Sequence, residues 1–298
     1  MSVGRLAFLV FLIASTASLS GCLARRRLIT RHGALPSRAL MTATKDDLVN
    51  RMRRLNDNVR SFSATVDMTP AIGSVYKGEI TEYKDVRAYV LFRRPAEIRI
   101  IGLYPVVRSK AFDMVSTGNE FRIYIPAKNR FVEGTNDAPA NSANKLENLR
   151  PAAFLEAMLI PPPDPGEQTV LEDATDENDA LYILHFLGKD DAGNPIISRN
   201  VWFDRQTLRI VRQKSFSKTG ITVSDTRYHD WKVYDNVAFP SGIDINRPVD
   251  GYGVVMTVTQ MEANKTLSQD KFVLPQPEGT QLQVIGQKPA PVAAAPRP

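Results

Sequence analysis

The stretch DVRAYVLFRRPAEIRIIG, residues 85–102, carries the pattern that decides the fold. Apolar residues occupy every second position from Val86 to Phe92, with charged or bulkier residues between them. Successive side chains of a β-strand point to opposite faces, so this spacing predicts a strand with one apolar face. Pro95 interrupts the ladder of hydrogen bonds, and a second apolar strand follows it. The stretch therefore predicts two strands of an antiparallel sheet.

The same alternation continues on both sides of this stretch. Short strands separated by turn residues are predicted within residues 61–68, 97–134 and 181–264. The turns are short, as antiparallel meanders require. The acidic run EDATDEND, residues 172–179, is interpreted as a solvated loop, and it lacks the spacing of a calcium-binding loop. The pattern predicts an α+β fold dominated by one large curved antiparallel sheet of about eleven strands.

Two segments replace the alternation by helical spacing. In residues 44–59, apolar residues recur at spacings of four and three, and Thr44 can cap the helix. A second helix is predicted over residues 149–159, and the prolines from Pro161 onward end it. Its apolar residues are Leu149, Ala153, Leu155, Met158 and Leu159. Helices that cover one face of a curved sheet incompletely, or that can move, would leave an apolar cavity.

The N-terminus has the pattern of an export signal. A charged start is followed by the apolar stretch LAFLVFLIASTA, and small residues precede Cys22, the only cysteine of the chain. LSGC, residues 19–22, resembles the lipobox of bacterial lipoproteins, which implies a signal peptide over residues 1–21 and lipidation of Cys22. The alternatives are an ordinary signal peptide or an uncleaved signal anchor. An exported domain without another cysteine has no internal disulfide.

The positive charge of the chain is concentrated beside this cysteine. The net charge is +6, but residues 1–45 contain seven Lys or Arg and no Asp or Glu, which leaves −1 for residues 46–298. This distribution argues against nucleic-acid binding. Residues 22–43, with Arg25, Arg26 and Arg27, are interpreted as a basic tether at an anionic membrane surface, the alternative being a linker kept soluble by its arginines. One domain is predicted over residues 44–286, followed by a disordered Pro/Ala-rich tail over 287–298.

The order of these elements resembles the LolA/LolB lipoprotein carriers and relatives such as LppX. LVNRMRRLNDNVRSFSATVDM resembles their opening helix and strand, and FRRPAEIRI resembles their strand that ends in a basic residue and a proline. MVSTGNEFRIYIP, RPAAFLEAML and TLSQDKFVLPQPEG resemble a hairpin, a mid-chain helix and a closing segment of that family, in the same order. The resemblance covers roughly residues 45–282 and implies an unclosed β-barrel whose helices form a lid over an apolar cavity.

The resemblance also implies a site. In the soluble carrier the Arg before the proline contacts the lid and helps to keep it closed, and Arg94 occupies the matching position. The alternative for Arg94 is a solvated charge at a strand end. Residues expected to contact an acyl chain share strand parity or lie on the second helix: Phe92, Ile98, Ile100, Phe121, Ile123, Ile125, Leu155, Met158 and Leu159. The membrane-bound receptor also has an exposed apolar loop residue, which the motifs do not locate in this sequence.

No pattern for catalysis, a cofactor or a metal site stands out. The S-x-x-K and K-T-G matches at Ser74 and Lys218 lack the order and helical context of penicillin-binding enzymes. His185 alternates with apolar residues and is interpreted as a structural histidine. The sequence therefore predicts a non-enzymatic protein without cofactors.

The sequence is compatible with two functions. The first is an outer-membrane lipoprotein facing the periplasm, which binds acyl chains of lipids or lipoproteins for transport or insertion and can meet a periplasmic carrier protein. The second is a non-transferring structural or sensor lipoprotein whose sheet is filled by its own side chains, because the same apolar alternation suits an ordinary core.

Overall fold

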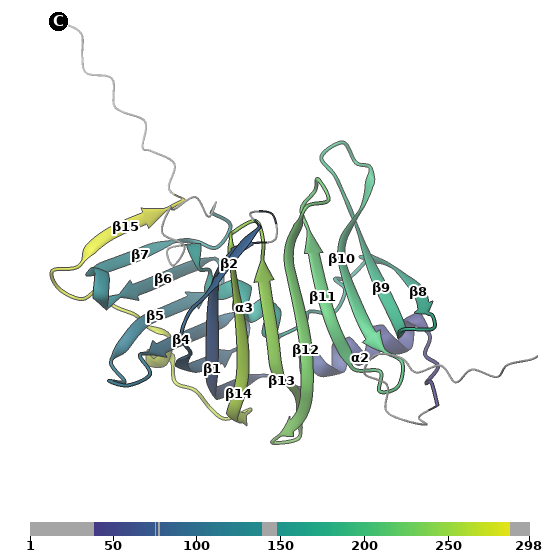
Figure 1. Ribbon diagram of the computed structural model, residues 1–298, viewed down its shortest axis with the longest axis horizontal. Coiled ribbons are helices and arrows are strands. Elements are labelled where there is room, and N and C mark those ends of the chain that lie inside the picture. The colour runs from purple at the N-terminus through teal and green to yellow at the C-terminus, as the bar shows by residue number, and fades with distance from the viewer. Residues whose placement is uncertain (1–38, 75, 77, 139–147, 287–298) are drawn as a thin grey trace, which may run out of the picture.

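A computed structural model describes residues 39–74, 76, 78–138 and 148–286 of the chain. Within these residues, fifteen strands join in one curved, unclosed sheet, and two α-helices lie against it (Figure 1). The helices are α2 (Lys45–Asp57) and α3 (Pro151–Met158). The strands are β1 (Ser61–Ser74), β2 (Glu79–Glu82), β3 (Val86–Arg93), β4 (Glu97–Leu103), β5 (Lys110–Thr117), β6 (Glu120–Ile125), β7 (Arg130–Thr135), β8 (Gln168–Thr175), β9 (Ala180–Lys189), β10 (Pro195–Asp204), β11 (Ile210–Phe216), β12 (Thr222–Tyr234), β13 (Val237–Arg247), β14 (Tyr252–Ala263) and β15 (Gln281–Ile285).

The sheet consists of two meanders joined at one seam. The strands from β1 to β7 form one meander, in which β2 pairs only with the end of β1, and the strands from β8 to β14 form the other. The two are united because β1 pairs with β14 along most of its length, from Phe62 opposite Ala263 to Ile72 opposite Tyr252. All neighbours are antiparallel except β15, which runs parallel to β7. The seam places the first and the last long strand of the domain side by side.

The expected number of about eleven strands is too low. The strands that the alternation did not predict are β2, β8 and β15, which lie at the sheet's edges or beside its main path. All four residues of β2 are exposed, and β8 and β15 contain no fully buried residue. The residues Glu172–Thr175, interpreted above as part of an acidic loop, belong to β8. Edge strands bury little apolar surface and are often charged, so they carry no apolar periodicity.

Both predicted helices exist. The α2 helix begins at a capping box, in which the Asp47 amide donates to the Thr44 hydroxyl and the Thr44 amide donates to the Asp47 carboxylate. The α3 helix is shorter than the predicted range 149–159. Arg150 has an extended backbone before Pro151, and Leu159 leaves the helical region before the proline run. Neither helix has the length and apolar character needed to span a membrane, among the residues described.

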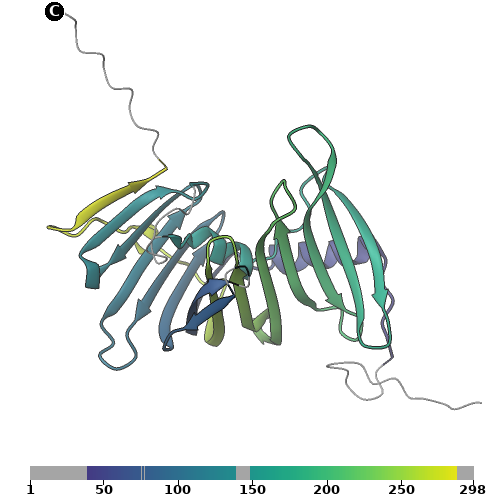
Figure 2. The same cartoon turned by 45° about the horizontal axis from the view of Figure 1, so that its top comes forward.

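Both α-helices pack on the same face of the sheet, which we call the inner face. The α2 helix lies across the β9–β12 region and α3 lies near the seam, as Figures 1 and 2 show. One continuous apolar cluster unites Leu48 and Met52 of α2 and Phe154 of α3 with the inner side chains of both meanders. The inner face is therefore the main core of the domain.

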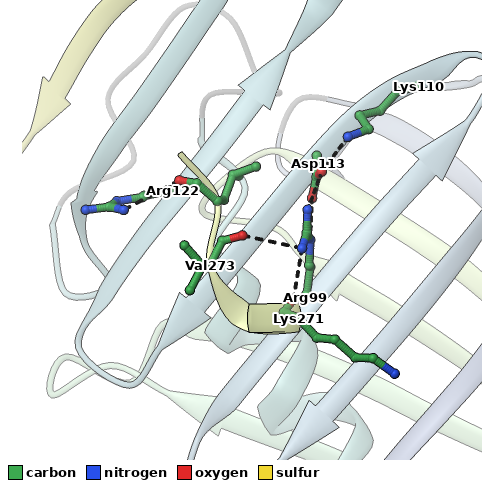
Figure 3. Close-up of polar contacts among 7 residues, drawn as sticks. Arg99, Lys110, Asp113, Arg122, Lys271 and Val273 are labelled. Atoms are coloured by element: carbon green, nitrogen blue, oxygen red, sulfur yellow. Dashed lines mark hydrogen bonds and ion pairs between the residues drawn. The ribbon is translucent and has the colours of Figure 1, made fainter. Parts of the chain in front are cut away.

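The opposite, outer face of the first meander is covered by residues 264–280, which we call the C-terminal strap. Leu267, Phe272 and Leu274 of the strap pack with Val115 and Phe131 in a second apolar cluster. The side chains of Arg99 and Arg122 donate hydrogen bonds to backbone carbonyls of the strap (Figure 3). Arg93 likewise donates to the Leu267 carbonyl. β15 follows the strap directly in the chain and adds one more strand to the sheet, beside β7.

Candidate functional site

The inner face of the first meander is a continuous apolar surface. The strand register places Phe92 opposite Ile98, and Ile100 opposite Met114, which in turn lies opposite Ile123. The six strand residues expected to contact a ligand all lie here, with exposed fractions between 0% and 3%: Phe92, Ile98, Ile100, Phe121, Ile123 and Ile125. Their position on one buried face agrees with the predicted parity, and their role in binding stays a prediction.

The α3 helix covers this surface. Phe154 and Met158 are buried against it, and the small residues Ala153 and Ala157 are buried on the same side of the helix. Small side chains let a helix axis approach a sheet closely. The other two helix residues expected to contact a ligand, Leu155 and Leu159, are partly buried at the margin of the same cluster. The α3 helix thus fills the space above this part of the sheet with its own side chains.

A small pocket lies where the ends of the two helices meet. It is lined by the end of α2, the residues that follow α3 and the β12–β13 hairpin, and its volume is about 20 Å³. This suffices for about one water molecule, whereas ligand pockets typically measure roughly 300–1,000 Å³. A second pocket of about 190 Å³ lies beside β6, β7 and β15 and has Glu120, Arg122 and Glu133 in its wall. The structure does not show the expected acyl-sized cavity between sheet and helices in the described residues.

Arg94 is hydrogen-bonded at this helix junction, with a different helix from the one expected. Its guanidinium donates to the Val59 carbonyl at 2.7 Å and to the backbone and side-chain oxygens of Asn56, at the end of α2. The reason is the register, because Arg93 lies opposite Ser61, the first residue after the α2–β1 connection. Asn56 in turn donates to the Ile160 carbonyl at 3.5 Å. Arg94 therefore reaches the segment after α3 only through Asn56.

We expect Arg94→Leu to loosen the end of α2. The lost bonds are partly solvent-exposed and together contribute about 1–2 kcal/mol, so local opening should become roughly tenfold more frequent. Hydrogen exchange of residues 53–60 measures this effect, and a smaller change is expected at residues 158–160. Arg93→Leu is the matched control, since Arg93 bonds the strap on the outer face. Unchanged exchange at both helix ends would show that Arg94 is only a solvated charge.

An apolar turn connects the ends of β4 and β5, two interior strands of the sheet. Val106 is 89% exposed and Val107 is 72% exposed, and Tyr104 beside them is also exposed. Arg108 follows Val107 directly, and Lys110 lies two residues further along the chain. Sequence reasoning did not select this turn, although LYPVVR combines apolar residues with a proline. Exposed apolar residues next to cations are typical of a segment that contacts a membrane interface.

The titratable groups of the site offer little for chemistry. The described residues contain no cluster of three or more His, Cys, Asp or Glu side chains placed to hold a metal ion. His185 contacts Asn200 and Glu172 at 2.9 and 2.7 Å, as suits a structural histidine. Cys22, Arg25, Arg26 and Arg27 lie outside the described residues.

No protein-family model matches this chain, and no curated protein matches it by sequence. Among solved structures, it is similar to a LolA superfamily protein from Nitrosomonas europaea, with a TM-score of 0.50 and 13% identity over 78% of this chain and 99% of that chain. It is also similar to a putative outer membrane lipoprotein-sorting protein domain from Vibrio parahaemolyticus (TM-score 0.49, 11% identity, 76% of this chain and 94% of that chain). A third similar structure is that of a DUF1329 family protein from Desulfovibrio piger (TM-score 0.48, 16% identity, 76% of this chain and 95% of that chain). The chain has a LolA-like fold, as the resemblance in its motifs predicted.

Proposed function

We propose that this protein is a lipid-anchored lipoprotein of the outer membrane that binds acyl chains of lipids or lipoproteins between its sheet and its helices, without catalysis. The observation that carries the proposal is a continuous apolar inner face covered by helices of only 13 and 8 residues. An 8-residue helix is not stable by itself and depends on its packing. An apolar chain that replaces this packing can therefore displace it.

The free energy gained by burying an acyl chain and the free energy lost by displacing α3 are of comparable size. Burial of an acyl chain of about 16 carbons gains on the order of 10 kcal/mol. Displacing α3 removes Phe154 and Met158 from the core, at about 1.5–3 kcal/mol for each side chain. The difference is reduced further by the ordering of the chain. Such a balance supports binding that can be reversed, which a carrier or receptor needs.

Native mass spectrometry of protein purified from its own membrane tests the proposal. A bound acyl-chain ligand of defined mass is the expected result. The packed inner face favours the second candidate, a structural or sensor lipoprotein. Side chains such as Ile98 and Ile100 have an exposed fraction of 0%, so no cavity large enough for a water molecule adjoins them in the described part of the chain. A protein that is free of ligand and does not bind a fluorescent fatty-acyl probe would support that candidate and contradict acyl binding.

We expect Cys22→Ser to abolish the membrane anchor. The residue is the only thiol of the chain, so no other cysteine can accept a diacylglyceryl group. Two or more acyl chains hold a protein stably on a membrane, and without them only weak attraction by Arg25, Arg26 and Arg27 remains. Fractionation of cells and mass analysis of the N-terminus measure the result. Unchanged membrane retention with a processed N-terminus would exclude lipidation at Cys22.

We expect Val106→Glu with Val107→Glu to impair delivery to a membrane while binding in solution remains. Insertion of two valine side chains gains about 1.5–3 kcal/mol each, so the association with vesicles should weaken at least 100-fold. Transfer of a fluorescent acyl probe to anionic vesicles measures the effect. Val249→Glu in the β13–β14 turn is the control, since Val249 is also exposed. Equal transfer rates for both variants would contradict a role for the β4–β5 turn.

A further inference from the structure

Part of the inner face is polar, and this part lies in the second meander. The strand register aligns Arg199 with Ser215 and Ser224, and Gln213 with Thr226, across β10, β11 and β12. Arg247 of β13 lies opposite Tyr252 of β14. We call the following set the polar stripe: Arg199, Gln213, Thr226, Tyr228, Arg247 and Tyr252. Its members share the face that carries the apolar core.

Three neutral groups of the stripe lack hydrogen-bond partners. Among the described residues, no hydrogen bond is made by the Gln213 side-chain oxygen, the Tyr228 hydroxyl or the Tyr252 hydroxyl. The Thr226 hydroxyl lies near that of Tyr228 without reaching hydrogen-bond geometry. The three residues are 8%, 3% and 3% exposed. A buried polar atom without a partner costs about 1–3 kcal/mol, so three on one surface indicate a missing ligand or bound water.

The charged groups of the stripe already have partners. The Arg247 guanidinium forms an ion pair with Asp250 at 2.5 Å. Arg199 donates to the Pro161 carbonyl at 2.7 Å and stacks on the Phe186 ring at 3.9 Å. The free hydrogen-bonding capacity of the stripe is therefore neutral. It consists of two hydroxyls, which donate and accept, and one amide oxygen, which only accepts.

Glu156 of α3 connects the two ends of the stripe. Its carboxyl group interacts electrostatically with Arg247 and Arg199, and burial raises its pKa above the usual range. Its side chain still reaches solvent. Glu156 thus places α3, whose eight residues span about 12 Å, beside the stripe.

We propose that the polar stripe binds the hydroxyl-bearing headgroup, a glycerol or a sugar, of a lipid whose acyl chain occupies the apolar inner face. The Gln213 oxygen needs a donor, which a hydroxyl supplies and a carboxylate does not. The Tyr228 and Tyr252 hydroxyls can bond the same headgroup or its ester oxygens. The inference rests on the proposed function, because it assigns the headgroup to one meander and the acyl chain to the other.

Competition with a fluorescent fatty-acyl probe tests this headgroup site, with 1-monopalmitoylglycerol, palmitate and free glycerol as competitors. The natural protein should bind monopalmitoylglycerol at least tenfold more tightly than palmitate, and free glycerol should not compete. In the double variant Tyr228→Phe with Tyr252→Phe, this preference should vanish while palmitate binding stays the same. Tyr234→Phe is the control, since the Tyr234 hydroxyl contacts the Val258 carbonyl instead.

The outcomes separate the two proposals. If neither lipid competes, acyl binding itself is wrong. If palmitate competes as well as monopalmitoylglycerol in the natural protein, or if free glycerol competes as well as the lipid, the headgroup site is wrong. Thermal unfolding of the ligand-free double variant gives a second measure. Removal of two unsatisfied hydroxyls should leave the melting temperature unchanged or raise it, whereas a fall would show that bound water already satisfies these groups.

Discussion

Replacing Arg99 with leucine is expected to lower the free energy of unfolding by about 3–5 kcal/mol. The Asp113 carboxylate is completely buried on the outer face, beneath the C-terminal strap. Arg99 holds both of its oxygens at 2.9 Å, and Lys110 donates to one of them at 2.7 Å (Figure 3). The same guanidinium donates to the Lys271 carbonyl at 2.9 Å. Its loss leaves a buried charge with one partner and removes one of the side-chain contacts that hold the strap.

Chemical denaturation measures the loss of stability, and two further variants show its cause. Arg87→Leu removes an ion pair with Asp67 in which both side chains are substantially exposed, so it should cost less than about 1 kcal/mol. The double variant Arg99→Leu with Asp113→Leu should recover much of the stability, because no charge is then buried without its partner. If Arg99→Leu lowered the free energy of unfolding as little as Arg87→Leu does, Lys110 alone would be enough to stabilise the buried Asp113 carboxylate.

Replacing Phe154 with alanine is expected to release α3 from the sheet while the sheet stays folded. Phe154 is the largest buried side chain of the helix, and removal of a buried phenylalanine costs about 3–5 kcal/mol. An 8-residue helix has little stability apart from such contacts. Hydrogen exchange of residues 151–158 should therefore become at least 100-fold faster. Binding of a hydrophobic dye should increase as the inner face becomes accessible.

Phe272→Ala provides the control for this experiment. Phe272 is also a buried phenylalanine, but it belongs to the cluster under the C-terminal strap. Its removal should speed exchange in residues 267–274 and leave α3 unchanged. If Phe154→Ala instead reduced the protection of all strands equally, α3 would be part of one cooperative unit with the sheet. That result would contradict a helix that can be displaced by a ligand.

The local elements of this protein were predictable from its sequence. The alternation from Val86 to Phe92 identified a strand and its buried face, and the helical spacing after Thr44 identified α2. Such periodicities show which side chains of one segment face an apolar surface, whatever elements form that surface. The strands β2, β8 and β15 escaped prediction for the same reason, because they bury little. The LolA-like fold followed from the order of the elements.

Contacts between distant segments were decided by the tertiary structure alone. The pairing of β1 with β14 joins residues about 180 to 200 positions apart, from Ile72–Tyr252 to Phe62–Ala263. The register of β1 with β3 sets which helix end Arg94 reaches. Neither the exposure of Val106 nor the missing partners of Gln213, Tyr228 and Tyr252 has a signature in local spacing. A hydrogen bond or a packed contact depends on both partners, and periodicity describes only one of them. The sequence thus determined which faces are apolar, whereas the assembled sheet determined what covers them and which buried polar groups have no partner among the described residues.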